Sequence, residues 1–167
     1  MIEFRSRSIG GDKLRKHFLD AATKATGLQR RTVQVGLFRE ARYADSNEPV
    51  AYIALIHEFG SSALGIPSRP WMRQGLVKAL PAVRQRLKKP DADGLRMPKE
   101  AELKIIGVLV EGFLKRSIKE GPFLPNAPAT AASKQAKTYQ GAASGSAKPL
   151  IDTGYLLSSI THKVKVV

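Results

Sequence analysis

The 167-residue sequence contains no cysteine, which excludes disulfide bonds, a cysteine nucleophile and thiolate metal ligands. It also lacks any run of about 18 apolar residues, so we expect no transmembrane helix and no membrane partner. The opening stretch, MIEFRSRSIGG, has no apolar core of the kind that a secretory signal peptide needs. These absences favour synthesis and folding in the cytoplasm.

Sequence patterns for cofactor and metal chemistry are also missing. Neither a phosphate-binding P-loop nor a dinucleotide fingerprint occurs. His57-Glu58 could begin a zinc-protease helix, but that chemistry needs a second histidine where the chain has Ser61. The other histidines, His17 and His162, fall in different predicted elements. The sequence therefore predicts no metal site and no cofactor.

Acidic residues are few: 14 Asp and Glu stand against 28 Lys and Arg, giving a net charge of +14. Such an excess favours polyanionic partners, because bound phosphates release counterions. Arg84, Arg86, Lys88 and Lys89 are the candidates for facing DNA or a lumen; alternatively they form a solvated helix end that complements the helix dipole. Residues 45–75 carry only two basic and three acidic side chains, which suits protein contacts.

Periodicity and helix-stop residues predict an α+β fold: a small antiparallel β-sheet packed against several α-helices, in a single domain over residues 1–167. The paired strands should be residues 32–38 and 161–167, because both alternate apolar and polar positions. The expected helices cover residues 14–25 with Asp12 as N-cap, 49–59 ended by Gly60, 69–89, 98–119, and a short stretch from Asp152 to Ile160.

Two of the longer helices have an apolar face. The stripe of helix 69–89 consists of Met72, Leu76, Leu80, Val83 and Leu87. Pro81 could kink this helix, because proline removes a backbone donor and clashes with the preceding turn. The stripe of helix 98–119 contains Ile106, Val110, Phe113 and Leu114.

Residues 126–148 hold eight alanines and three lysines but no acidic residue. A stretch of this composition buries too little apolar surface to offset its ordering entropy. We therefore expect residues 120–148 to form a long flexible loop near the C-terminus, either mobile or ordered by a partner. Its length favours an assembly role.

Ile151-Asp152-Thr153-Gly154 matches the catalytic triplet of an aspartic protease, which needs two carboxylates sharing one proton. Only thirteen residues follow Gly154, too few for the strands that surround such a triplet. Asp152 is better explained as the N-cap of the short helix, worth about 1 kcal/mol. The protease is the least favoured hypothesis.

Three segments follow one another in a distinctive order: AYIALIHEFG at 51–60, IPSRPWMR at 66–73 and KPLIDTGYLLSSI at 148–160. Together they resemble the tail-completion and virion-morphogenesis family of tailed bacteriophages, whose minor tail proteins join head and tail. Members typically show Glu-Phe-Gly at the end of an apolar helix, then Pro-x-Arg-Pro with an aromatic residue, and later Leu-x-Asp-Thr-Gly-x-Leu. The matching positions are Glu58, Phe59, Gly60, Pro67, Arg69, Pro70, Trp71, Leu150, Asp152, Thr153, Gly154, Leu156, Ser159 and Ile160.

This resemblance implies a non-enzymatic virion component at the head–tail junction or upper tail, assembled in the host cytoplasm. Relatives commonly form rings, often of six subunits, that contact neck connector or stopper proteins and tail-tube or terminator proteins. The lumen would hold viral DNA or the end of a tape-measure protein. The alternatives are a tail terminator or another neck connector and, in a different class, a sequence-nonspecific nucleic-acid-binding protein.

Elementary chemistry gives the matching residues roles of their own. Gly60 suits a helix C-cap that needs a positive φ angle. Pro67 and Pro70 stiffen a turn, and Arg69 can bond carboxylates or carbonyls with its planar fork. Trp71 is expected in the core rather than at an interface.

Overall fold

The computed structural model describes residues 31–87, 98–136, 138–139, 142–143 and 148–166. The chain divides into two compact units, Val33–Val164 and Met1–Thr32 with Lys165–Val167. Nearly all described residues belong to the first unit. The predicted helix 14–25, its Asp12 cap, Lys88 and Lys89 lie outside the described residues, and the single domain proposed for residues 1–167 stays a prediction.

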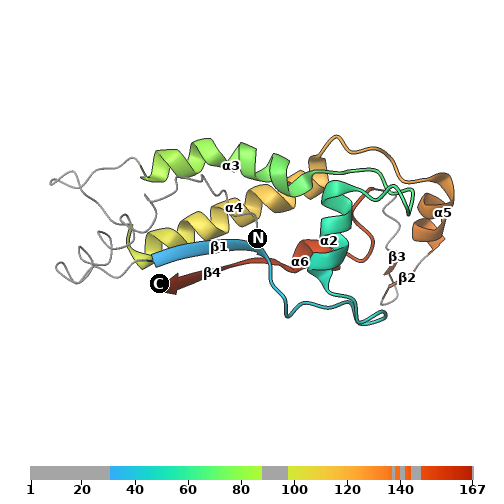
Figure 1. Cartoon of the computed structure of the whole chain (residues 1–167), viewed down its shortest axis with the longest axis horizontal. Coiled ribbons are helices and arrows are strands. Elements are labelled where there is room, and N and C mark those ends of the chain that lie inside the picture. The colour runs from blue at the N-terminus through green and yellow to red at the C-terminus, as the bar shows by residue number, and fades with distance from the viewer. Residues whose placement is uncertain (1–30, 88–97, 137, 140–141, 144–147, 167) are drawn as a thin grey trace, which may run out of the picture. The chain divides into compact units, whose positions relative to one another are not determined.

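The α+β class predicted from the sequence is confirmed. The elements are β1 (Arg31–Leu37), α2 (Val50–Phe59), α3 (Trp71–Leu87), α4 (Glu100–Glu120), α5 (Pro128–Ala136), β2 (Thr138–Tyr139), β3 (Ala142–Ala143), α6 (Tyr155–Ser158) and β4 (Ile160–Val166) (Figure 1). The predicted pairing of the first and last strands is also confirmed, because β1 and β4 form a two-stranded antiparallel sheet. Among the described residues, no helix combines the length and apolarity that crossing a bilayer requires.

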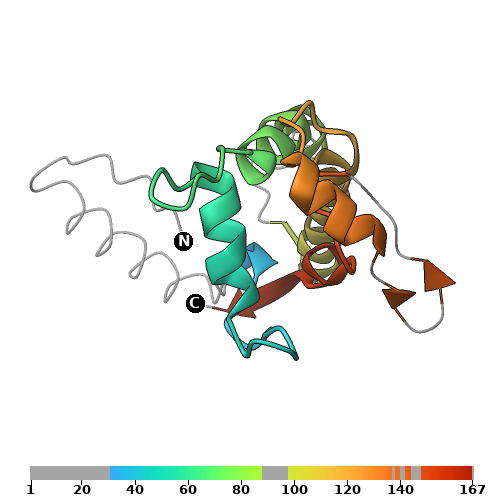
Figure 2. The ribbon, with the colours of Figure 1, turned by 90° about the vertical axis from the view of Figure 1, so that its right-hand side faces the viewer.

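Helix α4 is the centre of the unit, with α3 along one side and the β1–β4 sheet along another (Figure 1). Helices α2, α5 and α6 gather at one end of these layers (Figure 2). The buried residues of α4 lie on one side, as its apolar stripe predicts. The core cluster consists of Val50, Ala54, Trp71, Ala79, Ile106, Val110, Leu114, Ile118, Leu150, Leu156 and Ile160.

The predicted apolar stripe of α3 is a core face only in part. Met72 and Val83 are partly buried against the core, as predicted. Leu76, Leu80 and Leu87 are 43%, 46% and 53% exposed, whereas Trp71, Gly75 and Ala79 are buried. The reason is a close approach between helices: a Cβ atom on Gly75 would lie 2.9 Å from Cδ2 of Leu114 on α4. Small residues allow that approach, and the larger side chains are left on the outer face of α3.

The expectation of a loop over residues 120–148 is also wrong for part of the segment, because Pro128–Ala136 form α5. Alanine has the strongest intrinsic helix preference, and a proline at the first helical position has a suitable φ angle and needs no hydrogen bond there. The segment is therefore helical although its low hydrophobicity leaves none of its residues buried. Whether a partner orders the segment stays a prediction.

Strand β4 rests on α4 through His162. Its Nδ1 atom lies 2.9 Å from Oε2 of Glu111, whose other carboxylate oxygen accepts a hydrogen bond from Lys115. Burial alone would raise the pKa of Glu111, but its hydrogen bonds with Lys115 and His162 lower that pKa below its usual value. The imidazole also covers Gly107, where a Cβ atom would lie 2.4 Å from His162 Cδ2.

We therefore predict that Gly107→Ala destabilises the fold by about 1–3 kcal/mol, because the new methyl group must displace His162 and the strand that carries it. Gly112→Ala in the same helix is the matched control, since a Cβ atom there meets nothing within 4 Å. It should stabilise by about 0.5–1 kcal/mol, the helix preference of alanine over glycine. Urea unfolding measures both; equal changes in the two variants would contradict the packing described.

Candidate functional site

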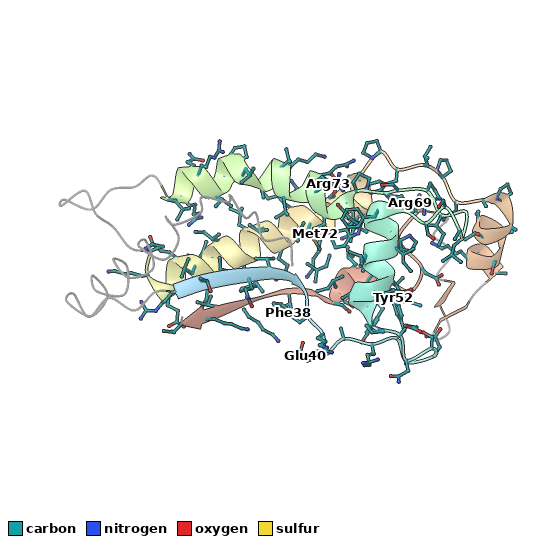
Figure 3. All side chains as sticks on the ribbon, in the orientation of Figure 1. Phe38, Glu40, Tyr52, Arg69, Met72 and Arg73 are labelled. Atoms are coloured by element: carbon teal, nitrogen blue, oxygen red, sulfur yellow. The ribbon has the colours of Figure 1, made fainter. Side chains whose placement is uncertain are left out.

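Glu58 joins the first two of the three resembling segments. It lies near the end of α2 and is only 7% exposed. Its Oε2 accepts a hydrogen bond from the Met72 backbone N–H at 2.9 Å, and its Oε1 accepts one from the Arg73 N–H at 3.2 Å. Met72 and Arg73 are labelled at the start of α3 in Figure 3. These N–H groups belong to the first turn of α3, where backbone N–H groups have no acceptor within their own helix. The helix dipole also favours a negative charge there. Glu58 therefore caps α3 from a different helix.

Gly60 lets the chain turn back immediately after this cap. Its φ angle of 79° is in the left-handed region, and its N–H donates to the Ile56 carbonyl oxygen at 2.7 Å, so the predicted C-cap is confirmed. A Cβ atom here would lie 2.8 Å from Ser68 N and 2.9 Å from Ile66 O. Only glycine therefore allows the segments 58–60 and 67–71 to pass so closely.

Arg69 extends the junction to the chain after α4. It is 4% exposed, and its Nε and Nη2 atoms donate to the carbonyl oxygens of Leu124 at 3.1 Å and Pro125 at 3.2 Å. Nη2 also lies 3.4 Å from Oδ1 of Asn126. Burial lowers the pKa of Arg69, yet a guanidinium keeps its proton in proteins. The predicted fork to carbonyl oxygens is thus confirmed, and it fixes the connection between α4 and α5.

The third segment reaches the same region through its backbone and its core residues. Leu150 and Leu156 are buried with Trp71 in one cluster, which confirms the core placement of that tryptophan. Lys134 of α5 donates from Nζ to the carbonyl oxygen of Ile151 at 2.9 Å. No sequence motif indicates a role for this lysine. Its contact with Ile151 depends on helix α5, which the composition of the segment did not predict.

The predicted capping role of Asp152 is wrong. Helix α6 begins at Tyr155, and its N-cap is Gly154, which has a φ angle of 78° and no side-chain capping bond. The Tyr155 N–H instead bonds Oγ1 of Thr153 at 3.2 Å. Because Gly154 turns left-handed, the helix starts two residues later than a cap at Asp152 requires.

All three segments line one open groove of about 1390 Å³. Its apolar wall includes Ile53, Leu64 and Leu156. The resembling positions that line it are Pro67, Arg69, Leu150, Asp152, Thr153, Gly154 and Leu156. Glu58, Gly60 and Trp71 do not line the groove; Glu58 and Trp71 are buried, whereas Phe59 is 53% exposed. Arg84 and Arg86 are exposed near the end of α3 and do not line this groove.

His57 also lines the groove, where its surroundings are unfavourable for a positive charge. Burial first, and then the charges of Arg69 and Lys134, lower the pKa of His57 to about 4. The imidazole is therefore neutral at pH 7. In the part of the chain that the structure describes, no three His, Cys, Asp or Glu side chains gather as a metal-ion site.

Comparisons of the chain with protein-family models, with curated proteins and with solved structures find no match. The resemblance to the phage family therefore stays a prediction that rests on the three segments.

Removing the Glu58 cap should destabilise the fold. Glu58→Leu leaves two N–H groups of α3 without acceptors and should lower the free energy of unfolding by about 2–4 kcal/mol. Glu58→Gln keeps one acceptor oxygen and should lose less. The control is Glu100→Gln, which removes an exposed ion pair with Lys104 and should change stability by less than about 0.5 kcal/mol. Urea unfolding that gave equal losses for Leu and Gln would show that the hydrogen bonds do not matter.

The lowered pKa of His57 predicts a specific acid sensitivity. Between about pH 6.5 and about pH 4 the unfolded imidazole binds a proton that the folded one does not. This contribution to stability is therefore complete above about pH 6.5 and is lost as the pH falls toward about 4. Urea unfolding across this window should show a smaller loss for His57→Gln than for the wild type. Parallel pH profiles would contradict the assignment.

Proposed function

We propose that this chain is a structural component of a tailed-bacteriophage virion, located at the neck or upper tail. There it completes the tail and joins it to the head as a ring of copies. The observation that carries the proposal is the junction of the three resembling segments. Their polar side chains, Glu58 and Arg69, bond to backbone groups of neighbouring elements and hold the walls of an open groove.

Such an arrangement suits an assembly protein, because a rigid frame presents a concave surface at low entropic cost on binding. The groove combines apolar side chains such as Ile53 and Leu64 with many polar and charged ones, and grooves on protein surfaces commonly take up segments of other proteins. Its occupants would be segments of neck connector, stopper, terminator or tail-tube proteins. Six copies is the ring size that the resemblance implies.

A tail terminator or another neck connector is the nearest alternative. A sequence-nonspecific nucleic-acid-binding protein is the second candidate, favoured by the net charge of +14 and by the exposed Arg84 and Arg86. In the virion the same charge would face DNA in the lumen. A steep fall in affinity of the isolated chain for duplex DNA with rising salt would support this candidate.

Inactivation of the gene in its phage tests the proposal. Filled heads and separate tails of normal length should accumulate, because tail polymerisation ends correctly but joining fails. Adding the purified chain should restore joined particles, and the Gly112→Ala variant, whose fold is expected to be intact, should restore them equally well. Tails of abnormal length would indicate the terminator instead. Joined, infectious particles that lack the chain would overturn the proposal.

A further inference from the structure

One part of the groove holds two cations beside a neutral imidazole. His57, Arg69 and Lys134 all line the groove. The Arg69 backbone N–H donates to the His57 carbonyl oxygen at 2.7 Å, and Figure 3 labels Arg69 beside α2, the helix that carries His57. Burial, and then the charges of Arg69 and Lys134, lower the pKa of His57, so both cations lie close to the imidazole. We call these three residues the cationic cluster.

The cationic cluster has hydrogen-bonding atoms that the described chain does not use. Arg69 spends Nε and Nη2 on the carbonyl oxygens of Leu124 and Pro125 and on Asn126. Its Nη1 has no partner among the described residues and is not fully buried, so its hydrogens can reach a molecule in the groove. The His57 imidazole makes no hydrogen bond there either; Nδ1 is buried, whereas Nε2 is not. Because Arg69 is only 4% exposed, an acceptor atom gains more here than on an open surface.

The carboxylates of the groove act on a different part of it. Burial, and then the charges of Asp152 and Asp45, raise the pKa of Tyr43. The charges that act on the imidazole of the cationic cluster are both positive. Lys134 stands between the two parts, because its Nζ donates to the carbonyl oxygen of Ile151, the neighbour of Asp152. The potential at the imidazole therefore favours an anion.

The surroundings of the cationic cluster narrow the choice of anion. A carboxylate and a phosphate can both accept the hydrogen bonds of an arginine. Leu64 and Leu124 also line the groove and are 65% and 62% exposed, and Arg69 bonds the carbonyl oxygen of Leu124 itself. A nucleic-acid backbone offers nothing to cover these leucines. A protein segment can place an apolar side chain next to an acidic one, which favours the carboxylate.

We propose that the cationic cluster binds the carboxylate of an aspartate or glutamate in a protein segment docked in the groove. The carboxylate accepts hydrogen bonds from Nη1 of Arg69 and from Nε2 of His57, and Lys134 adds its charge. A neutral imidazole carries one hydrogen, so binding selects the tautomer that has it on Nε2. This inference rests on the proposed function in taking the groove as a docking site for another protein, and it adds what the docked segment must carry.

Nuclear magnetic resonance of the imidazole groups in the full-length chain tests the site. The probe is the capped tripeptide acetyl-Leu-Glu-Leu-amide, and acetyl-Leu-Gln-Leu-amide is its uncharged control. The glutamate peptide should raise the pKa of His57 from about 4 to above about 5, because a bound carboxylate favours the charged ring about tenfold or more. The glutamine peptide should leave that pKa where it is.

His162 is the internal control, since it pairs with Glu111 and neither residue lines the groove. Its titration should be the same with both peptides. Equal responses of His57 to the two peptides, or no response to either, would overturn the proposal. An equal response to inorganic phosphate alone would overturn the choice of a protein segment.

Variants separate the site from the net charge of the chain. Lys134→Met should weaken binding of the glutamate peptide at least about fivefold, measured from the resonances of the peptide itself. Lys78→Met removes the same charge from an exposed position of α3 and should weaken it less than about twofold. His57→Leu changes no charge at pH 7 and should reduce the preference for the glutamate peptide over the glutamine peptide. Equal effects of Lys134→Met and Lys78→Met would show that net charge alone attracts the peptide, which refutes the site.

The peptide experiments use the purified chain, so they are independent of the phage. Peptide binding together with normal virions after gene loss would overturn only the virion role. Failed head–tail joining together with no response to the glutamate peptide would overturn only the carboxylate site.

Discussion

The carboxylate of Glu58 at the start of α3 is the interaction on which the rest of this unit depends. Its two hydrogen bonds tie the end of α2 to the first turn of α3 and thereby fix how these two helices cross (Figure 1). The tight turn at Gly60 brings the segments into contact, and Trp71, the first residue of α3, is buried in the core. Arg69, held between those residues, then reaches the carbonyl oxygens that follow α4.

Local chemistry made much of this predictable from the sequence. Two strands could be predicted because apolar and polar residues alternate in 32–38 and 161–167. The helix end at Gly60 and the bonds of Arg69 could be predicted because glycine and arginine have specific backbone and hydrogen-bonding properties. The failures have a different origin. The leucines of α3 predicted a core face, but the helix packs against α4 through Gly75. A single sequence does not show which small residue a neighbouring helix will approach.

Helix caps show the same limit of local sequence patterns. A sequence predicts a cap from the residue next to a helix, which indicates Asp152 for α6. The real cap of α3 comes from Glu58, on another helix and fourteen residues before Met72. The composition of 126–148 indicates little burial, and none of the residues of α5 is buried, yet its alanines still favour a helix. Low burial and low helix content are separate properties, so a segment with little apolar surface can still be helical.

The chain separations of the contacts around the groove imply an order of folding. The Glu58 bonds span 14 and 15 residues, while those of Arg69 span 55 and 56. Closing the longer loop costs more entropy, so the α2–turn–α3 hairpin can form while α4 is still unplaced. During synthesis on the ribosome, the hairpin would then form before Leu124 and Pro125, whose carbonyl oxygens bind Arg69, have been added to the chain. The groove, whose walls also need the Arg69 bonds, would then be completed after the α2–turn–α3 hairpin.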